Sequence, residues 1–415
     1  NILSLHNVSR RCRVEFDSKG GNSFVVTSDG GNVNVFQASD EGLYYYDINA
    51  PDKDATVLVN TVKENKTRYT NAEVVKAEYA RALQRRLGHV TMREFIRIVT
   101  NNLLPNCPVT KRDIMAAEDI FGPDLGSLKG KTVRRPPNQV DTTMTYKALP
   151  ATVHERYREV TLAGDIMKIN GIPFMVTTSV KIKFGTVEYL DKQTTGRMLK
   201  AIMSVLQVYK SGGFRVRHLM MDGQFESLRG ALLEAGVVLN TTSRDEHVGF
   251  IERYLRVIKE RSRCSFNTVP FKKMTDRMVI ELAGKVVFWL NAFPPKDGIS
   301  KTLSPRTIVT GKVLNHDRHC KYEFGEYVQT HEEHDNSMTT RTIGALAMRP
   351  TGNDQGGYYF MSLESGRIIK RDRATKLPMP SEVVDRVHCM ARQQKANPGL
   401  AFLDRNSQPY DDDDE

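Results

Sequence analysis

The sequence has few cysteines, one tryptophan and no long hydrophobic run. Five cysteines are scattered among 415 residues, and none forms a Cys-x-x-Cys pair. A disulfide framework is therefore not expected, and this cysteine usage favours a reducing, intracellular compartment. No apolar run approaches the roughly 18 residues that a membrane helix needs, so we expect no membrane partner.

The beginning of the chain also lacks an initiator methionine and a secretory signal. It reads NILSLHNVSRRCRVEF, in which no apolar segment follows a charged one. We expect the chain to be a processed product or a piece of a longer polyprotein.

Basic residues outnumber acidic ones. Sixty Lys and Arg against 49 Asp and Glu give a formal net charge of +11, although the residues from Asp411 to Glu415 are all acidic. This surplus favours a polyanionic partner, nucleic acid first. A soluble basic enzyme with a solvated surface explains the charge equally well, so charge alone leaves the partner open.

The polarity and the hydrophobic periodicity of the sequence change several times along the chain, which predicts a multidomain α/β protein. Residues 61–70 are polar and predict a linker, and helical periodicity follows from Ala72, with a capping box at Thr91 and Glu94 that begins a second helix. A third helix is expected from Lys111. The expected parts are a short-strand segment (1–60), a small helical module (61–128), a basic linker (129–150), a catalytic core (151–320), a small β barrel (321–382) and a polar, acidic tail (383–415), which we expect to be disordered.

The core segment has the most informative order of elements. Residues 155–264 predict three strands, a long helix, a strand, a helix, a short strand and a last helix. This order, βββαβαβα, matches the ribonuclease H-like fold, in which a three-strand meander adjoins two parallel strands. After Phe324, alternating strands separated by turn signals predict a five-stranded barrel of the SH3-like type.

Two motifs that suggest chemistry fail on spacing. GSLKGKT at 126–132 has one residue too few before its Gly-Lys pair for a phosphate-binding loop, and no predicted strand precedes it. A second motif, a group of His and Cys residues between 316 and 334, does not form the two short-spaced ligand pairs of a structural zinc site. We expect these side chains to be solvated: His316, His319, Cys320, His331 and His334.

Three carboxylates converge if the core has this topology. Asp165 lies in the first core strand, Asp222 ends the fourth strand, which is parallel to the first, and Glu252 begins the last helix. Hard oxygen ligands suit Mg²⁺ or Mn²⁺, and two such ions roughly 3.5–4 Å apart catalyse phosphoryl transfer. We predict these three residues to be catalytic and to bind the metal. Taken singly, each also has a structural explanation: a strand-edge acid, the start of a turn and a first-turn helix acid.

Cations follow Glu252 on one stripe of the same helix. Arg256, Lys259 and Arg263 stand four, seven and eleven residues after it, and we predict that they contact DNA phosphates. A solvated basic face with Glu–Arg pairing is the alternative. Further predicted DNA contacts lie in the linker and the barrel: Lys129, Lys131, Arg134, Arg135, Arg367, Lys370 and Arg371.

Several segments, in order, resemble the integrase region of a copia-type LTR retrotransposon polyprotein. HVGFIER resembles the family's HNGVAER segment, which places the catalytic glutamate at Glu252. The other matching segments are QRRLGHVTMREF (84–95, the RLGH core of the pre-integrase module), MDGQFE (221–226, the segment around the second aspartate), TLSPRTIVTG (302–311) and GGYYFMSLESGRIIKRD (356–372, the hairpin of the C-terminal barrel).

The resemblance implies a function and its partners. A member of this family is a polynucleotidyl transferase of the DDE type, with nuclease activity, that inserts element cDNA into target DNA. Double-stranded DNA, as element ends and target, would be its substrate, and a homo-oligomer would join the two ends. The protein would reside in a virus-like particle before integration and in the nucleus during it.

The chain departs from the family in two places. The family's N-terminal zinc module uses two His and a Cys-x-x-Cys pair, of which only His89 and Cys107 are present, so we expect no zinc. The segment between Asp222 and Glu252 is shorter than usual; Glu246 or Glu260 would be the next candidates for the third acid. A decayed or domesticated copy that binds DNA without catalysis, and a ribonuclease H-like nuclease, are the alternative functions.

Overall fold

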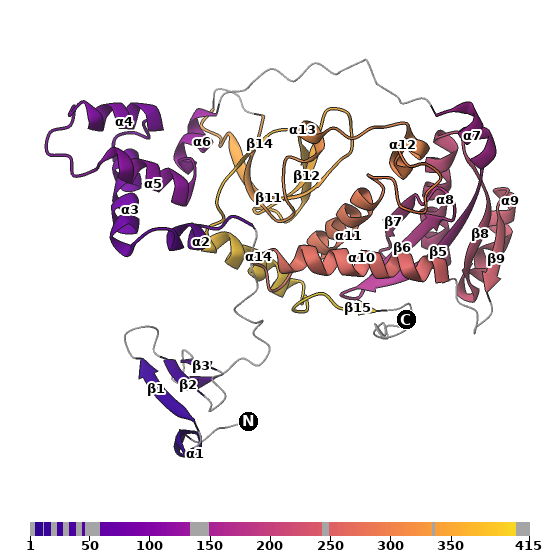
Figure 1. Ribbon diagram of the computed structural model, residues 1–415, viewed down its shortest axis with the longest axis horizontal. Coiled ribbons are helices and arrows are strands. Elements are labelled where there is room, and N and C mark those ends of the chain that lie inside the picture. The colour runs from indigo at the N-terminus through magenta and orange to yellow at the C-terminus, as the bar shows by residue number, and fades with distance from the viewer. Residues whose placement is uncertain are drawn as a thin grey trace. The chain divides into compact units, whose positions relative to one another are not determined.

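The computed structural model describes residues 5–10, 12–17, 23–27, 33–38, 44–45, 59–132, 149–242, 249–333 and 337–403 (Figure 1). The chain divides into two compact units, residues 1–55 and 56–415. No helix in the described part of the chain combines the length and apolar character that crossing a membrane requires.

The first unit contains the short strands that the sequence predicts. They form an antiparallel sheet in the order β1-β2-β3-β4. Phe16, Phe24 and Tyr44 pack on one another, with ring centroids 4.8 Å apart for the first two and 4.6 Å for the last two. The elements are α1 (Leu5–Ser9), β1 (Arg13–Asp17), β2 (Ser23–Thr27), β3 (Val33–Ala38) and β4 (Tyr44–Tyr45).

The second unit begins with five helices: α2 (Val62–Thr67), α3 (Asn71–Arg86), α4 (Met92–Thr100), α5 (Lys111–Phe121) and α6 (Leu125–Lys131). The three helices predicted from periodicity are present as α3, α4 and α5. The linker predicted at 61–70 is wrong, because α2 lies there: the side chain of Thr61 caps its N-terminus, and Asn65 Nδ2 donates to the carbonyl oxygen of Asp119, 3.0 Å away. The basic linker predicted from residue 129 likewise begins inside α6.

A mixed sheet follows, in the strand order β7-β6-β5-β8-β9. The first three strands are antiparallel neighbours, and β8 runs parallel to both β5 and β9. This arrangement of a meander beside two parallel strands is consistent with the predicted ribonuclease H-like core. The elements are α7 (Ala151–Tyr157), β5 (Glu159–Ile169), β6 (Ile172–Ser179), β7 (Gly185–Tyr189), α8 (Thr195–Ser211), β8 (Arg215–Asp222), η1 (Gly223–Leu228), α9 (Arg229–Glu234) and β9 (Val238–Thr242).

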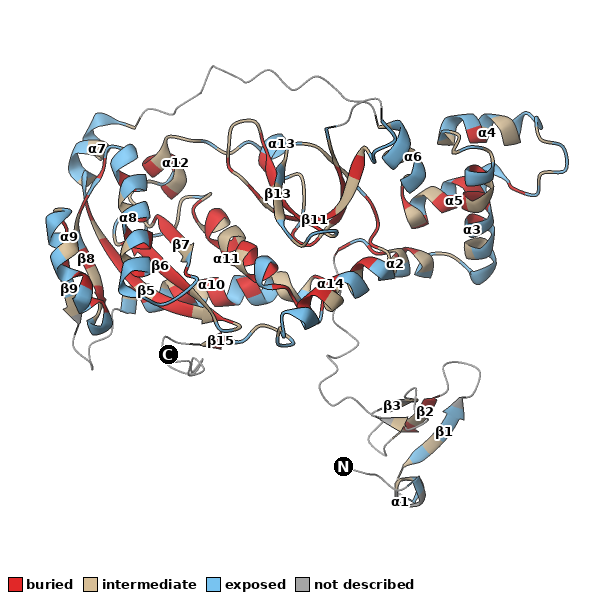
Figure 2. Cartoon of the chain, turned by 180° about the vertical axis from the view of Figure 1, so that it is seen from behind, coloured by how far each residue is buried: buried red, intermediate tan, exposed pale blue. Residues whose placement is uncertain are grey.

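Helices cover both faces of this sheet, and alternate side chains of β5 point to the two faces. Leu162 and Ile166 pack in a core with Ile202 of α8. Ala163 and Met167 pack in a second core with α10 (Gly249–Asn267) and α11 (Asp276–Leu290). Figure 2 shows the buried residues along β5 and β6 and on the helix surfaces turned toward them. The helices α12 (Pro305–Thr310) and α13 (His316–His319) follow.

The predicted C-terminal strands are present as a five-stranded antiparallel sheet in the order β13-β12-β11-β10-β14. The last strand returns to pair with the first, but no pairing joins β13 to β14 among the described residues. The closed SH3-like barrel therefore stays a prediction. The strands are β10 (Tyr327–His331), β11 (Thr342–Pro350), β12 (Tyr358–Ser362), β13 (Ile368–Arg371) and β14 (Ala374–Lys376).

The polar tail predicted from residue 383 is wrong as far as residue 403. Ser381–Gln393 form helix α14, whose Val383, Val387 and Met390 are buried in the core that also holds α10 and α11. The short strand β15 (Phe402–Leu403) then pairs antiparallel with the end of β5. Because residues of β11 and β12 join the same core, the mixed sheet, the C-terminal strands and the chain beyond them share one apolar interior.

Candidate active site

Asp165 and Asp222 lie at the same level of neighbouring strands. The last paired residues of β5 and β8 are Ala163 and Met220, and each aspartate comes two residues after one of them. Adjacent strands are roughly 4.8 Å apart, so this register places the two carboxylate-bearing residues side by side. Topology therefore brings together two acids that lie far apart in the sequence.

Both aspartates lie on the face of the sheet that α10 covers. Side chains two residues apart on a strand share a face. Ala163 and Met167, on either side of Asp165, belong to the core that includes α10, and Met220, two residues before Asp222, packs against the same core. Both acids are half-buried. The pair is thus partly shielded from water and turned toward the helix that carries Glu252.

Glu252 lies in the first turn of α10 and is exposed. Its neighbours Ile251 and Leu255 are buried in the core beneath the helix, together with Ala163 of β5. The three predicted acids consequently lie on one side of the sheet, two on adjacent strands and one at the start of the covering helix.

The predicted three-ligand metal group is not assembled. The described residues contain no group of three His, Cys, Asp or Glu side chains that could hold a metal ion. Carboxylates repel one another when no cation lies between them, and one oxygen of Asp165 accepts the backbone N–H of Ile166 at 2.7 Å. The half-buried aspartate pair nevertheless fits Mg²⁺ or Mn²⁺ in ligand type and position. The register supports the placement of the two aspartates on neighbouring strands, and the catalytic and metal-binding roles of Asp165, Asp222 and Glu252 stay a prediction.

A contact between α10 and β7 holds the first turn of this helix in place. A Cβ atom on Gly185 would come within 1.9 Å of Tyr254 Oη, so the strand approaches the helix at a point where only glycine fits. The amide of Asn291 holds the same glycine through two hydrogen bonds of 2.8 Å: the Gly185 N–H donates to Asn291 Oδ1, and Asn291 Nδ2 donates to the Gly185 carbonyl oxygen. The hydroxyl of Tyr254 is buried without a hydrogen-bond partner in the described part of the chain.

We expect Tyr254→Phe to raise the free energy of unfolding by up to about 1 kcal/mol, because it removes a buried, unpaired hydroxyl. Gly185→Ala should lower it by roughly 1–3 kcal/mol through overpacking, and less so in the Tyr254→Phe background. Urea denaturation of the two single variants and the double variant measures both effects. An equal cost of Gly185→Ala in the two backgrounds would show that the hydroxyl is not what the new methyl group meets.

The predicted cation stripe on α10 is only partly exposed. Lys259 has a relative exposure of 5%, which removes it from the exposed stripe that the sequence predicts. It stands four residues after Leu255, whose side chain is buried in the core. Arg256 and Arg263 are exposed; Arg256 Nε donates to Glu260 at 3.3 Å, and the Arg263 guanidinium lies 5.5 Å from the ring centroid of Phe402. Their predicted contact with DNA stays a prediction.

The other predicted DNA contacts are distributed over α6 and the C-terminal sheet. Lys129 and Lys131 lie exposed in α6, and Lys131 Nζ donates to the carbonyl oxygen of His89 at 2.6 Å. Arg371 is bound to Glu332, with 3.0 Å between Nε and Oε1. Two exposed cations, Arg367 and Lys370, flank the same hairpin, and Arg134 and Arg135 lie outside the described residues.

The histidines near residue 320 do not form a metal cluster among the described residues. His319 is 3% exposed, so its predicted solvation is wrong. Its Nδ1 accepts the backbone N–H of Asn315, and Nε2 lies 3.0 Å from the carbonyl oxygen of Asn353, to which it donates in the matching tautomer. These bonds tie α13 to the loop before β12. His331 Nε2 lies 3.0 Å from Thr375 Oγ1, and His334 lies outside the described residues.

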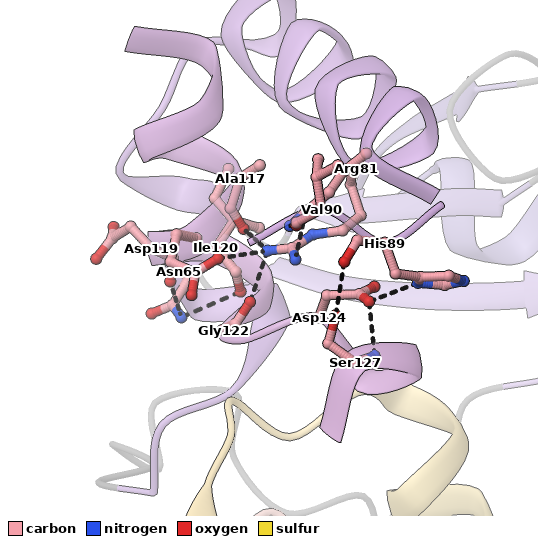
Figure 3. A network of polar contacts seen from close by, with 12 residues as sticks. Asn65, Arg81, His89, Val90, Ala117, Asp119, Ile120, Gly122, Asp124 and Ser127 are labelled. Atoms are coloured by element: carbon pink, nitrogen blue, oxygen red, sulfur yellow. Dashed lines mark hydrogen bonds and ion pairs between the residues drawn. The ribbon is translucent and has the colours of Figure 1, made fainter. Parts of the chain in front are cut away.

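A polar network joins the helices of residues 61–132 (Figure 3). The buried guanidinium of Arg81 donates to the carbonyl oxygens of Ala117 and Gly122, at 3.0 and 2.6 Å. His89 Nδ1 lies 2.7 Å from Asp124 Oδ2. Burial raises the pKa of Asp124, but hydrogen bonds from His89 and from Ser127 outweigh it and lower the pKa overall. The two residues that match ligands of the family's zinc module have different surroundings. His89 belongs to this polar network, and Cys107 packs against the apolar core.

We expect the purified protein to contain no stoichiometric zinc, and chelation to leave residues 72–122 folded, because this network and the apolar core hold these helices together. Elemental analysis and circular dichroism with and without chelator measure the two outcomes. One tightly bound zinc per chain would contradict this account and direct attention to His316 and His331.

Comparison with known proteins finds similarity to solved structures. No family model matches the sequence, and no curated protein matches it. The chain is similar to the catalytic core domain of BIV integrase, at 18% identity and a TM-score of 0.27, over 36% of this chain and 92% of that chain. It is also similar to the HTLV-2 integrase catalytic core domain in complex with magnesium. The trimeric form gives 14% identity, a TM-score of 0.28 and 36% and 95% coverage, and the dimeric form 14%, 0.26, 36% and 94%.

Proposed function

We propose that this chain is a retrotransposon integrase of the copia type, a divalent-metal polynucleotidyl transferase that inserts element cDNA into target DNA. The observation that carries the proposal is the shared level of Asp165 and Asp222 on parallel strands, on the face where α10 carries Glu252. The resemblance of HVGFIER and MDGQFE to the family's segments around the same two acids, Glu252 and Asp222, supports it.

The residues of the site have separable tasks. Asp165 and Asp222 would hold Mg²⁺ or Mn²⁺, and Glu252 would complete the ligand set from the first turn of α10. When bound, such ions activate the attacking oxygen and stabilise the leaving one. The 3′-hydroxyl of an element end would attack a target phosphate and displace the 3′-oxygen of the target strand, after water has trimmed the end where trimming is needed. Exposed Arg256 and Arg263 would hold backbone phosphates, which position DNA without reading its sequence.

Assembly and location follow from the same proposal. Two element ends must be joined to one target, so we propose a homo-oligomer that brings two sites together. We place the protein inside the cell, in a virus-like particle before integration and in the nucleus during it.

Two other functions have specific observations in their favour. The absence of a three-carboxylate ligand group among the described residues favours a decayed or domesticated copy that binds DNA without catalysis. The sheet order is equally compatible with a nuclease that cuts RNA–DNA hybrids. The HVGFIER segment, which resembles the integrase family, and the C-terminal strands favour an integrase over that nuclease.

One assay separates the three functions. Purified protein is incubated with a labelled duplex that resembles an element end, a plasmid target, and separately an RNA–DNA hybrid, each with Mg²⁺ or Mn²⁺. We expect labelled DNA joined to the plasmid, with chelated samples as the control. Cleavage of the hybrid without joining identifies the nuclease, and binding of DNA without any product identifies the decayed copy.

A further inference from the structure

The turn between β6 and β7 rests on the first turn of α10. Gly185, at the end of this turn, lies so close to Tyr254 that a Cβ atom would come within 1.9 Å of its hydroxyl oxygen. Within the turn, Ser179 N–H donates to the carbonyl oxygen of Phe184 at 3.0 Å, and Asn291 fixes both backbone groups of Gly185. The turn is therefore held rigidly against the helix end that carries Glu252.

This contact gathers three cations. Lys183 has φ +64°, and its Nζ lies 4.0 Å from the ring centroid of Phe250, which is in the first turn of α10. Lys181 is exposed in the same turn of the chain. Arg253 follows Glu252 directly, and its Nε donates to the carbonyl oxygen of Gly249 at 3.2 Å.

Lys183 is partly buried and lies near two like charges. Partial burial lowers the pKa of Lys183, Asp297 opposes this, and the positive charges of Arg253 and Lys181 lower the pKa further. Among the described residues, no carboxylate forms an ion pair with Lys181, Lys183 or Arg253. A rigid group of three cations, of which only Lys183 feels a nearby carboxylate (Asp297) and none is ion-paired among the described residues, is suited to a polyanion from outside the chain.

We propose that Lys181, Lys183 and Arg253, here called the turn–helix patch, bind backbone phosphates of the DNA strand that reaches Glu252. The proposal rests on the proposed function and deepens it by naming a surface that sets the strand's position. Arg256, exposed and three residues after Arg253, extends the patch along one side of α10. Phosphates held beside Glu252 would fix the position of the reacting phosphate relative to the aspartate pair. A small displacement of the reacting phosphate lowers the reaction rate strongly.

The test compares Lys181→Gln/Lys183→Gln with Lys200→Gln/Lys210→Gln. The second pair is exposed on α8, which packs on the opposite face of the sheet, and removes the same charge. Arg253→Gln is a second patch variant at an exposed position. Binding to labelled duplexes is measured by fluorescence anisotropy over a range of salt concentrations without divalent metal, so that the readout does not depend on catalysis.

We expect the Lys181/Lys183 variant to flatten the slope of log K against log salt by up to roughly two units and Arg253→Gln by about one, equally on every duplex sequence. The α8 variant should keep the wild-type slope. If the wild type joins no DNA but the patch variants still flatten the slope, the proposed function fails and the patch stands. Wild-type protein that binds no duplex, or patch variants whose slope equals that of the α8 variant, would overturn the inference.

Discussion

Asp165→Asn, Asp222→Asn and Glu252→Gln should each reduce strand joining by about a thousandfold or more, while the protein stays folded. Each change replaces an acid by an amide of nearly the same shape, so it removes ligand charge and leaves packing in place. Losses of this size are typical when one member of a catalytic set is removed. The two aspartates are half-buried in strands on the α10 face, and Glu252 is exposed, so the glutamine variant is the least disturbing to the fold.

The joining assay with labelled duplex ends measures this loss, and thermal unfolding confirms that each variant is folded. Glu260→Gln is the matched control, because Glu260 lies further along the same helix and accepts from Arg256 Nε at 3.3 Å. Joining that survives in one of the three variants removes that residue from the site. Loss in Glu260→Gln and survival in Glu252→Gln would move the third acid to Glu260.

Arg81→Met should lower the free energy of unfolding by about 3 kcal/mol. Arg81 is 5% exposed, and its guanidinium donates to the carbonyl oxygens of Ala117 in α5 and of Gly122 just after it. It also lies 3.1 Å from Glu118 Oε2. Its removal takes this donor from the carbonyl oxygen of Gly122, which lies outside the helix, and deprives Glu118 of its cation. The methionine replaces only the apolar part of the arginine side chain.

Hydrogen exchange of residues 61–132, together with urea denaturation, shows where the stability is lost. Arg85→Met is the control, since Arg85 is exposed one turn further along α3, and we expect a change of no more than about 0.5 kcal/mol. Equal losses in the two variants would mean that the buried network of Arg81 does not hold these helices together.

The placement of the two aspartates on neighbouring parallel strands could be predicted from sequence because it depends on local patterns and topology. Hydrophobic periodicity places strands and helices in the order βββαβαβα, and this order determines which strands are neighbours. Once β5 and β8 are parallel neighbours, Asp165 within β5 comes to the level of Asp222 at the end of β8. Asp165 and Asp222 therefore follow from the order of elements, without any knowledge of individual contacts.

Contacts between distant segments were not predictable in the same way. A helical stripe shows that Lys259 and Arg256 share a side of α10, but not which packed neighbour buries one and leaves the other exposed. The pairing of Phe402 with Ile169 joins two segments that lie far apart in the sequence, and no local pattern signals it. The helix α14 did have a readable signal, since Val383, Val387 and Met390 recur at helical spacing in a polar stretch. The meeting of Lys183 with Phe250 is tertiary and has no signature in either segment.

Binding of Mn²⁺ by the free protein tests most directly whether the aspartate pair is a metal site. Calorimetric titration would compare the wild type with Asp165→Asn/Asp222→Asn and with Asp191→Asn/Asp317→Asn, a pair of exposed acids away from the site. We predict that the wild type and the control pair bind Mn²⁺ alike and that the Asp165/Asp222 variant loses this binding. Unchanged Mn²⁺ affinity in the Asp165/Asp222 variant would contradict the account.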